Sequence, residues 1–278
     1  MKRLTQLLRQ PLENITFITL DIETTGLSPI EDKIVEIAGV KFTLREEKRK
    51  FHSLINPRIP IPEDVARIHG IRDRDVKGKP TLREILPSLR EFLGWDNILL
   101  LYNAWFDLSF LAKAFYDHHI APPPLPVVDI YKLLRFYKES LALERLSLRK
   151  VVETLGKKKS FQFHRAMGDS LALREIFLGL VEKKKIRNLG EILQEKDIIL
   201  FSEGYTTGNR VEGVYSFLNQ YIKERKNISL RYRHRLFSII PLDIVKAGKK
   251  YYLYSSILPT FEKKFFELEE VREFVLPE

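Results

Sequence analysis

The pattern of hydrophobic and polar positions changes along the chain, and its first part is typical of alternating strands and helices. Residues 17–20 are apolar on both faces of a predicted strand, as in the centre of a sheet. Two further runs rich in β-branched and aromatic residues, 33–44 and 51–55, surround a charged turn. After a short amphipathic helix within residues 1–13, we therefore expect three antiparallel strands.

The middle of the chain combines short apolar runs with segments of helical periodicity. Apolar runs at residues 97–102 and 125–130 predict buried strands. Thr81 and Glu84 have the spacing of a capping box. The helices expected here span residues 81–93, 104–116, 130–138, 147–155 and 166–183, with Asn103 and Ser147 as caps. The sequence thus predicts an α/β fold with a mixed sheet, antiparallel at first and then parallel, flanked by helices.

After three lysines at residues 183–185 the pattern changes. We expect a helix over residues 211–225, followed by short strands at 228–232, 236–240, 243–245, 250–255 and 264–268. This spacing predicts a small β-rich module and not a continuation of the α/β layer. We therefore divide the chain into a first domain (1–185), a linker (186–210) and a second domain (211–278).

Composition narrows the possible functions. The chain has 278 residues, and its 47 Lys and Arg exceed its 37 Asp and Glu. This excess of positive charge favours nucleic acid as a partner, with general solubility as the alternative explanation. Cysteine is absent, so any metal must be held by oxygen or imidazole, as hard ions such as Mg²⁺ or Mn²⁺ are. No apolar run has the length of a membrane span or forms a signal-peptide core, so we expect a cytoplasmic protein with no membrane partner.

Four acids and one histidine suggest a catalytic centre. Asp21 and Glu23 alternate on the first strand and therefore point to the same face, where each raises the pKa of the other unless cations neutralise them. Asp107 and Asp169 lie in the first turns of two helices, and His164 lies in the loop before the second. Taken singly, these last three also fit helix-dipole acids and a solvated loop residue. Together they predict a paired-metal site that hydrolyses phosphodiester bonds, with the histidine accepting a proton from water.

The order of four motifs resembles that of a known family. Asp-Ile-Glu-Thr-Thr-Gly (21–26), Ile-His-Gly-Ile (68–71), Asn-Ala-Trp-Phe-Asp (103–107) and His-Arg-Ala-Met-Gly-Asp (164–169) are similar to motifs of the DEDDh 3′–5′ exonucleases. That family belongs to the ribonuclease H-like superfamily and includes the proofreading epsilon subunit of bacterial DNA polymerase III. The resemblance covers about residues 13–183. It implies a ribonuclease H-like sheet.

The resemblance also assigns roles to single residues. It implies that two Mg²⁺ or Mn²⁺ ions are bound by Asp21, Glu23, Asp107 and Asp169, with His164 as general base. It places the substrate near Thr24, Leu27, His69, Asn103 and Phe106; core packing is the alternative for Leu27 and Phe106. Tyr102 stands where many members have histidine, but that position is not a metal ligand in the family.

The C-terminal strands resemble a WYL domain in their order, with Tyr251 in place of its tryptophan and Glu270 where many members have arginine. That resemblance implies a module that binds nucleic acid or nucleotides and regulates a partner domain. Several cations lie among Tyr and Phe residues, a composition suited to phosphates and stacked bases: Arg231, Arg233, Arg235, Lys249 and Lys250. A basic, solvated edge strand is the alternative interpretation.

The residues themselves predict phosphodiester hydrolysis by two metals, and the resemblance implies 3′–5′ polarity and release of nucleoside 5′-monophosphates. We therefore expect a metal-dependent exonuclease that acts on single-stranded DNA or frayed 3′ ends and serves proofreading or repair. Arg165 and the lysines at 157–159 are expected to steer the phosphate backbone. Two alternatives stay open: a non-catalytic nucleic-acid sensor, and an exonuclease that trims RNA. A DNA polymerase subunit is a candidate partner, with residues 194–201 as a loose candidate for a clamp-binding peptide. The oligomeric state is not determined by the sequence.

Overall fold

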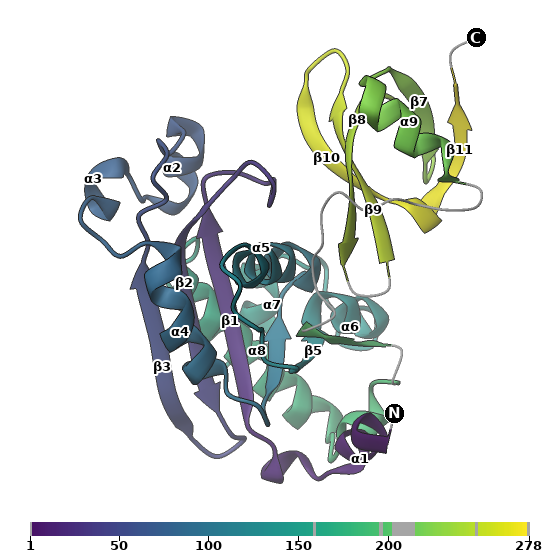
Figure 1. Cartoon of the computed structure of the whole chain (residues 1–278). Helices are drawn as coiled ribbons and strands as arrows, with labels where there is room; N and C mark the ends of the chain where they lie inside the picture. The colour runs from purple at the N-terminus through teal and green to yellow at the C-terminus, as the bar shows by residue number, and fades with distance from the viewer. Residues whose placement is uncertain (1, 158–159, 195–196, 202–214, 248–249, 277–278) are drawn as a thin grey trace.

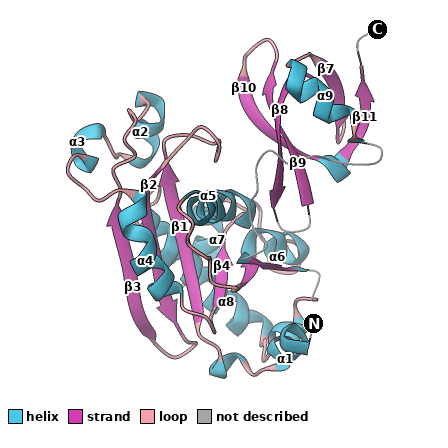
Figure 2. Cartoon of the chain, viewed as in Figure 1, coloured by secondary structure: helices cyan, strands magenta, loops and turns pink. Residues whose placement is uncertain are grey.

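The computed structural model describes all residues except 1, 158–159, 195–196, 202–214, 248–249 and 277–278. Two separate sheets organise these residues, and helices flank the larger one (Figures 1 and 2). The larger sheet has the strand order β3-β2-β1-β4-β5-β6, and the smaller one has the order β10-β9-β8-β7-β11. No helix among the described residues is long and apolar enough to cross a membrane.

The larger sheet is mixed, as the sequence predicts. Its first three strands are antiparallel neighbours: β1 (Phe17–Thr24), β2 (Ile34–Phe42) and β3 (Glu47–Leu54). Two strands then run parallel to β1, namely β4 (Ile98–Leu101) and β5 (Pro126–Asp129). A short sixth strand, β6 (Ile198–Leu200), pairs antiparallel with β5. This strand lies within the segment predicted as a linker, and the domain boundaries stay a prediction.

Helices cover both faces of this sheet. On one face, α4 (Leu82–Leu93) and α5 (Ala104–Asp117) pack against Ile18 and Leu20 of β1. On the other face, α7 (Leu148–Leu155) and α8 (Ala166–Lys184) enclose Phe17. Because neighbouring residues of β1 enter two different cores, this strand is apolar on both faces. Among the described residues, the first domain also has the helical elements α1 (Lys2–Arg9), η1 (Leu12–Asn14), α2 (Glu63–His69), α3 (Asp73–Val76), α6 (Ile130–Tyr137) and η2 (Leu189–Glu191).

Helix capping agrees with the sequence at α4 and differs at two other helices. Thr81 and Glu84 form the predicted capping box. Asn103 occupies the N-cap position of α5 but makes no side-chain cap bond, because its backbone is left-handed with φ 62°. Asp129 accepts a hydrogen bond from the backbone of Ala104 in its place. Ser147 likewise stands at the start of α7 without a side-chain cap bond, so both predictions of a side-chain cap are wrong.

The C-terminal domain is an antiparallel five-stranded sheet with helix α9 (Phe217–Glu224) packed on its core. Its strands are β7 (Ile228–Tyr232), β8 (Arg235–Ala247), β9 (Lys250–Ile257), β10 (Glu262–Glu267) and β11 (Val271–Val275), with η6 (Leu268–Glu270) before the last. β8 is one long strand with an irregularity between Pro241 and Asp243, where the sequence predicts two strands. β11 is not predicted by the sequence, and the expected helix start at 211–214 lies outside the described residues.

Candidate active site

The acids of β1 lie at its C-terminal half, in the middle of the larger sheet. Asp21 and Glu23 share the face of β1 that meets α8, and Asp169 lies in the first turn of that helix. One carboxylate oxygen from each of these three residues lies within 4.8 Å of the other two. The structure thus brings together three of the acids that the sequence singles out.

Asp107 approaches the same strand from the other side. It lies in the first turn of α5, is only 3% exposed, and accepts a hydrogen bond from the backbone of Ile22, between Asp21 and Glu23. Its Oδ1 atom is buried with no hydrogen-bond partner among the described residues. The helix start therefore aims a carboxylate at the acids of β1.

The loop before α8 joins His164 to Asp169. The backbone N–H of His164 donates to Oδ2 of Asp169 over 3.0 Å, and the His164 backbone is left-handed with φ 58°. Gly168 makes this possible, because a Cβ atom there would lie 1.9 Å from the carbonyl oxygen of Gln162. The imidazole of His164 is exposed, and Oδ1 of Asp169 is a second buried oxygen without a hydrogen-bond partner among the described residues.

The electrostatics of the cluster are unfavourable without cations. Burial, followed by repulsion from neighbouring acids, raises the pKa of Glu23 to about 8 and that of Asp21 well above its usual value. Burial is also the main cause that raises the pKa of Asp107 to about 8 and that of Asp169 to about 6. Two oxygens without hydrogen-bond partners and four acids of raised pKa fit a site for hard divalent cations, which prefer carboxylate ligands.

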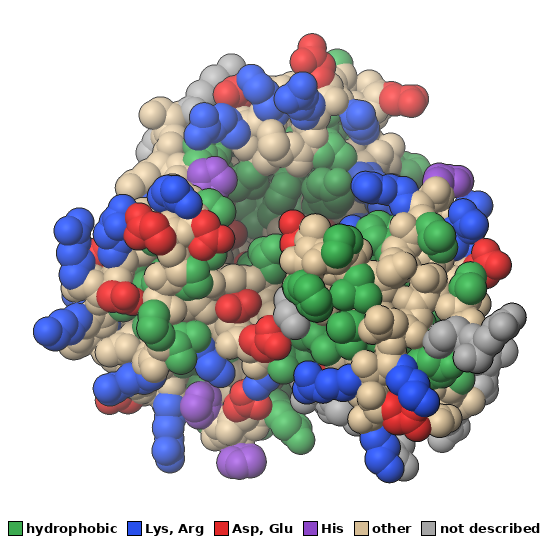
Figure 3. All heavy atoms as spheres, turned by 90° about the horizontal axis from the view of Figure 1, so that it is seen from above, with side chains coloured by type: hydrophobic (Ala, Val, Ile, Leu, Met, Phe, Trp, Pro, Cys, Tyr) green, Lys and Arg blue, Asp and Glu red, His purple; other side chains and the backbone are tan. Residues whose placement is uncertain are grey.

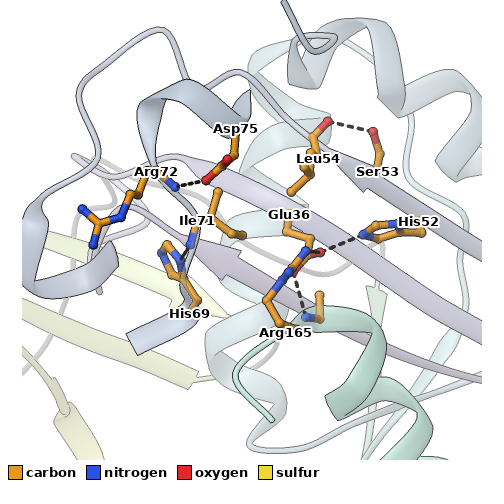
Figure 4. A network of polar contacts seen from close by, with 10 residues as sticks. Glu36, His52, Ser53, Leu54, His69, Ile71, Arg72, Asp75 and Arg165 are labelled. Carbon is orange, nitrogen blue, oxygen red and sulfur yellow. Dashed lines mark hydrogen bonds and ion pairs between the residues drawn. The ribbon is translucent and has the colours of Figure 1, made fainter. Parts of the chain in front are cut away.

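Glu36 is a buried acid that the sequence analysis missed. It lies opposite Glu23 in the β1–β2 ladder and is fully buried. Its carboxylate accepts hydrogen bonds from Nε and Nη2 of Arg165 (3.0 and 2.7 Å), pairs with Nε2 of His52 (2.7 Å), and accepts from the backbone N–H of Ala166 (3.0 Å), the first residue of α8. Figure 4 shows His52 and Arg165 converging on it.

These partners decide the charge of Glu36. Burial alone would raise its pKa, but the hydrogen bonds from Arg165, His52 and Ala166 lower the pKa below its usual value. Glu36 therefore stays ionised behind Glu23, whose pKa is raised. A single acid inside the apolar run of residues 34–40 was the available signal in the sequence.

The residues predicted to contact substrate surround the acids in different ways. Leu27, just after β1, is 68% exposed and so does not belong to the core. Thr24 is buried, and its hydroxyl donates to the carbonyl of Gly26. Phe106 is half-buried against Phe110, and Asn103 is exposed. Their roles toward substrate stay predictions.

Two further predicted contacts already have partners within the protein. His69 is buried at the end of α2, and its Nδ1 accepts from the backbone N–H of Ile71 over 3.0 Å. The Arg165 guanidinium is bound to Glu36, so it is not a free cation at the surface. Of the lysines at 157–159, Lys157 pairs with Glu182, and the other two lie outside the described residues.

The mixed sheet and the acids at the end of its central strand define an α/β protein with a candidate divalent-metal centre. The RNase_T (Exonuclease) family model matches residues 18–177, more than half of the chain, and the chain therefore belongs to this exonuclease family. With its four acids and His164, the matched region is an exonuclease domain of the DEDDh type, which is the enzyme class predicted from the sequence. Members of this class use divalent metals and hydrolyse phosphodiester bonds from the 3′ end.

Curated relatives of this chain carry the name PolC-type DNA polymerase III. The chain is 36% identical over 192 residues to the PolC-type DNA polymerase III of Thermotoga petrophila, a match that covers 67% of this chain and 14% of the relative. It is 31% identical over 228 residues to the PolC-type DNA polymerase III of Clostridium perfringens, a match that covers 82% of this chain and 15% of the relative. The chain thus spans only a small part of the length of these relatives.

Solved structures confirm the ribonuclease H-like fold. Escherichia coli Exonuclease I in complex with a dA16 oligonucleotide has a TM-score of 0.54 at 16% identity and covers 84% of this chain and 55% of its own. The nuclease domain of 3′hExo, a DEDDh family member bound to rAMP, has a TM-score of 0.51 at 20% identity. This match covers 60% of this chain and 92% of the 3′hExo chain. The family match ends at residue 177, so it does not reach the C-terminal sheet, and the WYL identity of that sheet stays a prediction.

Proposed function

We propose that this protein removes nucleotides one at a time from the 3′ end of single-stranded DNA or of a frayed duplex, releasing nucleoside 5′-monophosphates. The observation that carries the proposal is the convergence of Asp21, Glu23 and Asp169, whose carboxylate oxygens lie within 4.8 Å of one another. Asp107 joins them from α5, and His164 is tied to Asp169. Acids from three elements are otherwise costly to bury together.

Asp21, Glu23, Asp107 and Asp169 would hold two Mg²⁺ or Mn²⁺ ions. Such ions, when bound, supply positive charge for the attacking and leaving oxygens of the phosphodiester and lower the pKa of water. The protein itself contributes the fixed positions of the ligands. Asp107 is held by the backbone of Ile22 and Asp169 by the backbone of His164, so neither carboxylate has to be ordered when substrate binds.

His164 is the proposed general base. Its imidazole is exposed, while its backbone N–H is fixed to the carboxylate of Asp169. A side chain that is free to turn on a fixed backbone can reach a water molecule next to the acids and accept its proton. Arg165, the next residue, points away from His164 and binds the carboxylate of Glu36.

The 3′-terminal nucleotide is proposed to lie against Leu27, Thr24, Phe106 and Asn103, with His69 beside the strand. The exposed side chain of Leu27, four residues after Glu23, offers an apolar surface to a base. Seen from above, the molecule has a central hollow lined by hydrophobic side chains, with Lys and Arg along parts of its rim (Figure 3). The apolar walls suit the stacked bases of a single strand and the Lys and Arg side chains suit its phosphates, while Asp and Glu side chains also lie around the hollow (Figure 3).

DNA is the proposed substrate because the curated relatives are DNA polymerases, and a polymerase subunit is the proposed partner in proofreading or repair. The predicted clamp-binding segment does not strengthen this, since residues 198–200 belong to β6 and 195–196 lie outside the described residues. A nucleic-acid contact of the C-terminal domain also stays a proposal. Arg231, Arg233 and Lys250 pair there with Glu273, Glu270 and Glu267, and Lys249 is not described.

A label at either end of the substrate tests the proposal. We would incubate 3′-labelled and 5′-labelled single-stranded DNA, and matched RNA, with Mg²⁺, Mn²⁺ or EDTA. Asp107→Asn should lose about 100-fold or more of the rate. Asp117→Asn, at the other end of the same helix and paired with Lys113, is the matched control and should digest normally. Binding without cleavage by the wild type would favour the sensor, and faster digestion of RNA would favour RNA trimming.

A further inference from the structure

The C-terminal domain contacts the exonuclease domain at two segments that flank the acids. The first is the start of α5, where the ring of Trp105 packs against Tyr252 and Phe265, with centroid distances of 4.9 and 4.3 Å. Trp105 lies two residues before Asp107 and directly precedes Phe106. In Figure 1, the lower ends of β8 and β9 reach toward α5, and Ala112 of α5 packs with residues of this domain.

The second contact is the loop that follows β1. Tyr254 is only 1% exposed and stacks on Phe265, and its hydroxyl donates to Oε2 of Glu31 over 3.1 Å. The side chain of Ser28 also hydrogen-bonds this hydroxyl. Burial raises the pKa of Tyr254 above its usual value, so the hydroxyl remains a hydrogen-bond donor at neutral pH.

This loop is a small folded unit built around Asp32. Oδ1 of Asp32 accepts from the Thr25 hydroxyl (3.1 Å), and Oδ2 accepts from the backbone N–H of Ser28 (2.8 Å). Gly26 leaves room for this side chain, because a Cβ atom there would lie 2.4 Å from Oδ2 of Asp32 and would force it to shift. A displacement of Glu31 therefore moves the loop as one piece, together with the exposed Leu27 that it carries.

We propose that the C-terminal domain is a positioning element of the nucleotide site. Tyr254 fixes the loop that carries Leu27, and the aromatic pair Tyr252 and Phe265 fixes the first turn of α5 through Trp105. The inference rests on the proposed function, in which Leu27 and Phe106 contact the 3′-terminal nucleotide. Small displacements of residues that hold a substrate are costly, since catalysis depends on the reacting groups being held in register.

An interface that only joins the two domains would respond to mutation differently from one that positions the nucleotide site. Removing a contact that only joins the domains lowers stability but leaves the affinity of a folded enzyme for its substrate unchanged. A positioning contact changes the order of the loop and the KM for oligonucleotide while kcat and the metal dependence change little. These readouts separate the two cases.

Tyr254→Phe is the test variant, because it keeps the buried ring and removes only the hydroxyl. Tyr215→Phe is the matched control, since the Tyr215 hydroxyl donates to the carbonyl of Leu268 inside the C-terminal domain over 3.2 Å. We expect hydrogen exchange of the amides of residues 25–33 to become faster in Tyr254→Phe and not in the control. We also expect KM for a single-stranded oligonucleotide to rise roughly fivefold to tenfold, as for loss of one hydrogen bond, with kcat changed less than about twofold.

A double variant identifies the residue through which the effect passes. If Tyr254 acts through Leu27, adding Tyr254→Phe to Leu27→Ala should raise KM no further. Unchanged amide exchange in Tyr254→Phe, or faster exchange with an unchanged KM in an active enzyme, would overturn the inference alone. Failure of the wild-type protein to shorten any oligonucleotide from its 3′ end would instead overturn the proposed function.

Discussion

Glu36 and Arg165 form a two-pronged ion pair behind the acids of β1, with Nε–Oε2 and Nη2–Oε1 distances of 3.0 and 2.7 Å. Glu36 is fully buried and lies opposite Glu23, whereas Arg165 directly follows His164. The pair therefore ties the loop of the proposed general base to the strand next to β1. Because Glu36 also accepts from Ala166, the same carboxylate fixes the start of α8, which carries Asp169.

Neutralising this carboxylate should harm both stability and activity. In Glu36→Gln the Arg165 guanidinium loses its charged partner, and removing one member of a buried pair costs about 3 kcal/mol of unfolding free energy. The unfolding free energy, measured with denaturant, and kcat should both fall. Glu63→Gln is the control, because Glu63 makes the same kind of bond to Arg72 at the exposed surface, where the expected loss is below about 0.5 kcal/mol. Equal stability of the two variants would contradict this account.

The raised pKa values of the acids predict that, as pH rises, the stability of the metal-free protein falls while the stabilising effect of Mg²⁺ grows. Mainly because of burial, the pKa values of Glu23 and Asp107 are raised to about 8 in the folded protein, above the usual 4.5 and 3.8. The metal-free fold thus binds protons more tightly than the unfolded chain, and its stability should fall as pH rises toward and through about 8. Mg²⁺ competes with those protons, so its stabilising effect should grow over the same range.

Thermal unfolding between pH 6 and 9, with Mg²⁺ or EDTA, measures both trends. Asp107→Asn removes one of the titrating groups and should flatten the pH dependence of the metal-free protein. Asp117→Asn, an acid near the exposed end of the same helix, should leave it unchanged. A metal effect that does not vary with pH would contradict the raised pKa values.

Gly168 should tolerate no side chain. A Cβ atom in Gly168→Ala would meet the backbone of Gln162, so the loop with His164 must move, and overpacking of this kind costs about 3 kcal/mol. Gly179→Ala is the matched control on the same helix, since its Cβ would lie 2.0 Å from the carbonyl of Leu155, away from the acids. Both variants should lose stability, but only Gly168→Ala should lose kcat when each is assayed well below its melting temperature.

Leu27 should contribute to substrate affinity and not to stability. Because its side chain is 68% exposed, Leu27→Ala should leave the melting temperature unchanged. If a base packs on this side chain, KM should rise about tenfold, as expected for loss of an apolar contact. Leu236→Ala, a comparably exposed leucine of the C-terminal domain, should change neither quantity. A lower melting temperature with an unchanged KM would assign Leu27 to packing.

Local pattern predicted much of the first domain and less of the second. The strand with Asp21 and Glu23 was predictable because it is apolar on both faces and then breaks at a turn. The single strand β8 was not, since Pro241 interrupts the pattern while the strand continues past an irregularity. β6 has only three residues, and in β11 the adjacent charged residues Arg272 and Glu273 break the alternation of apolar and polar positions.

The contacts around the site were harder to predict for a different reason. Glu36 and Arg165 are 129 residues apart, and Tyr254 and Glu31 are 223 apart, so no local pattern links them. The predicted side-chain cap by Asn103 was wrong because Asp129, distant in the sequence, accepts the hydrogen bond from the backbone of Ala104 at the helix start. Long-range partners of this kind are set by the fold and not by neighbouring residues.

The most direct test of the central claim is the identity of the first product. The wild-type protein with Mg²⁺ would be given a 5′-labelled single-stranded DNA, and the released material analysed by mass spectrometry over time. Successive loss of nucleoside 5′-monophosphates with a 5′-labelled ladder that shortens stepwise is the predicted result. Release of 3′-monophosphates, internal cuts, or no metal-dependent product would contradict the assignment of Asp21, Glu23, Asp107, Asp169 and His164 to 3′–5′ phosphodiester hydrolysis.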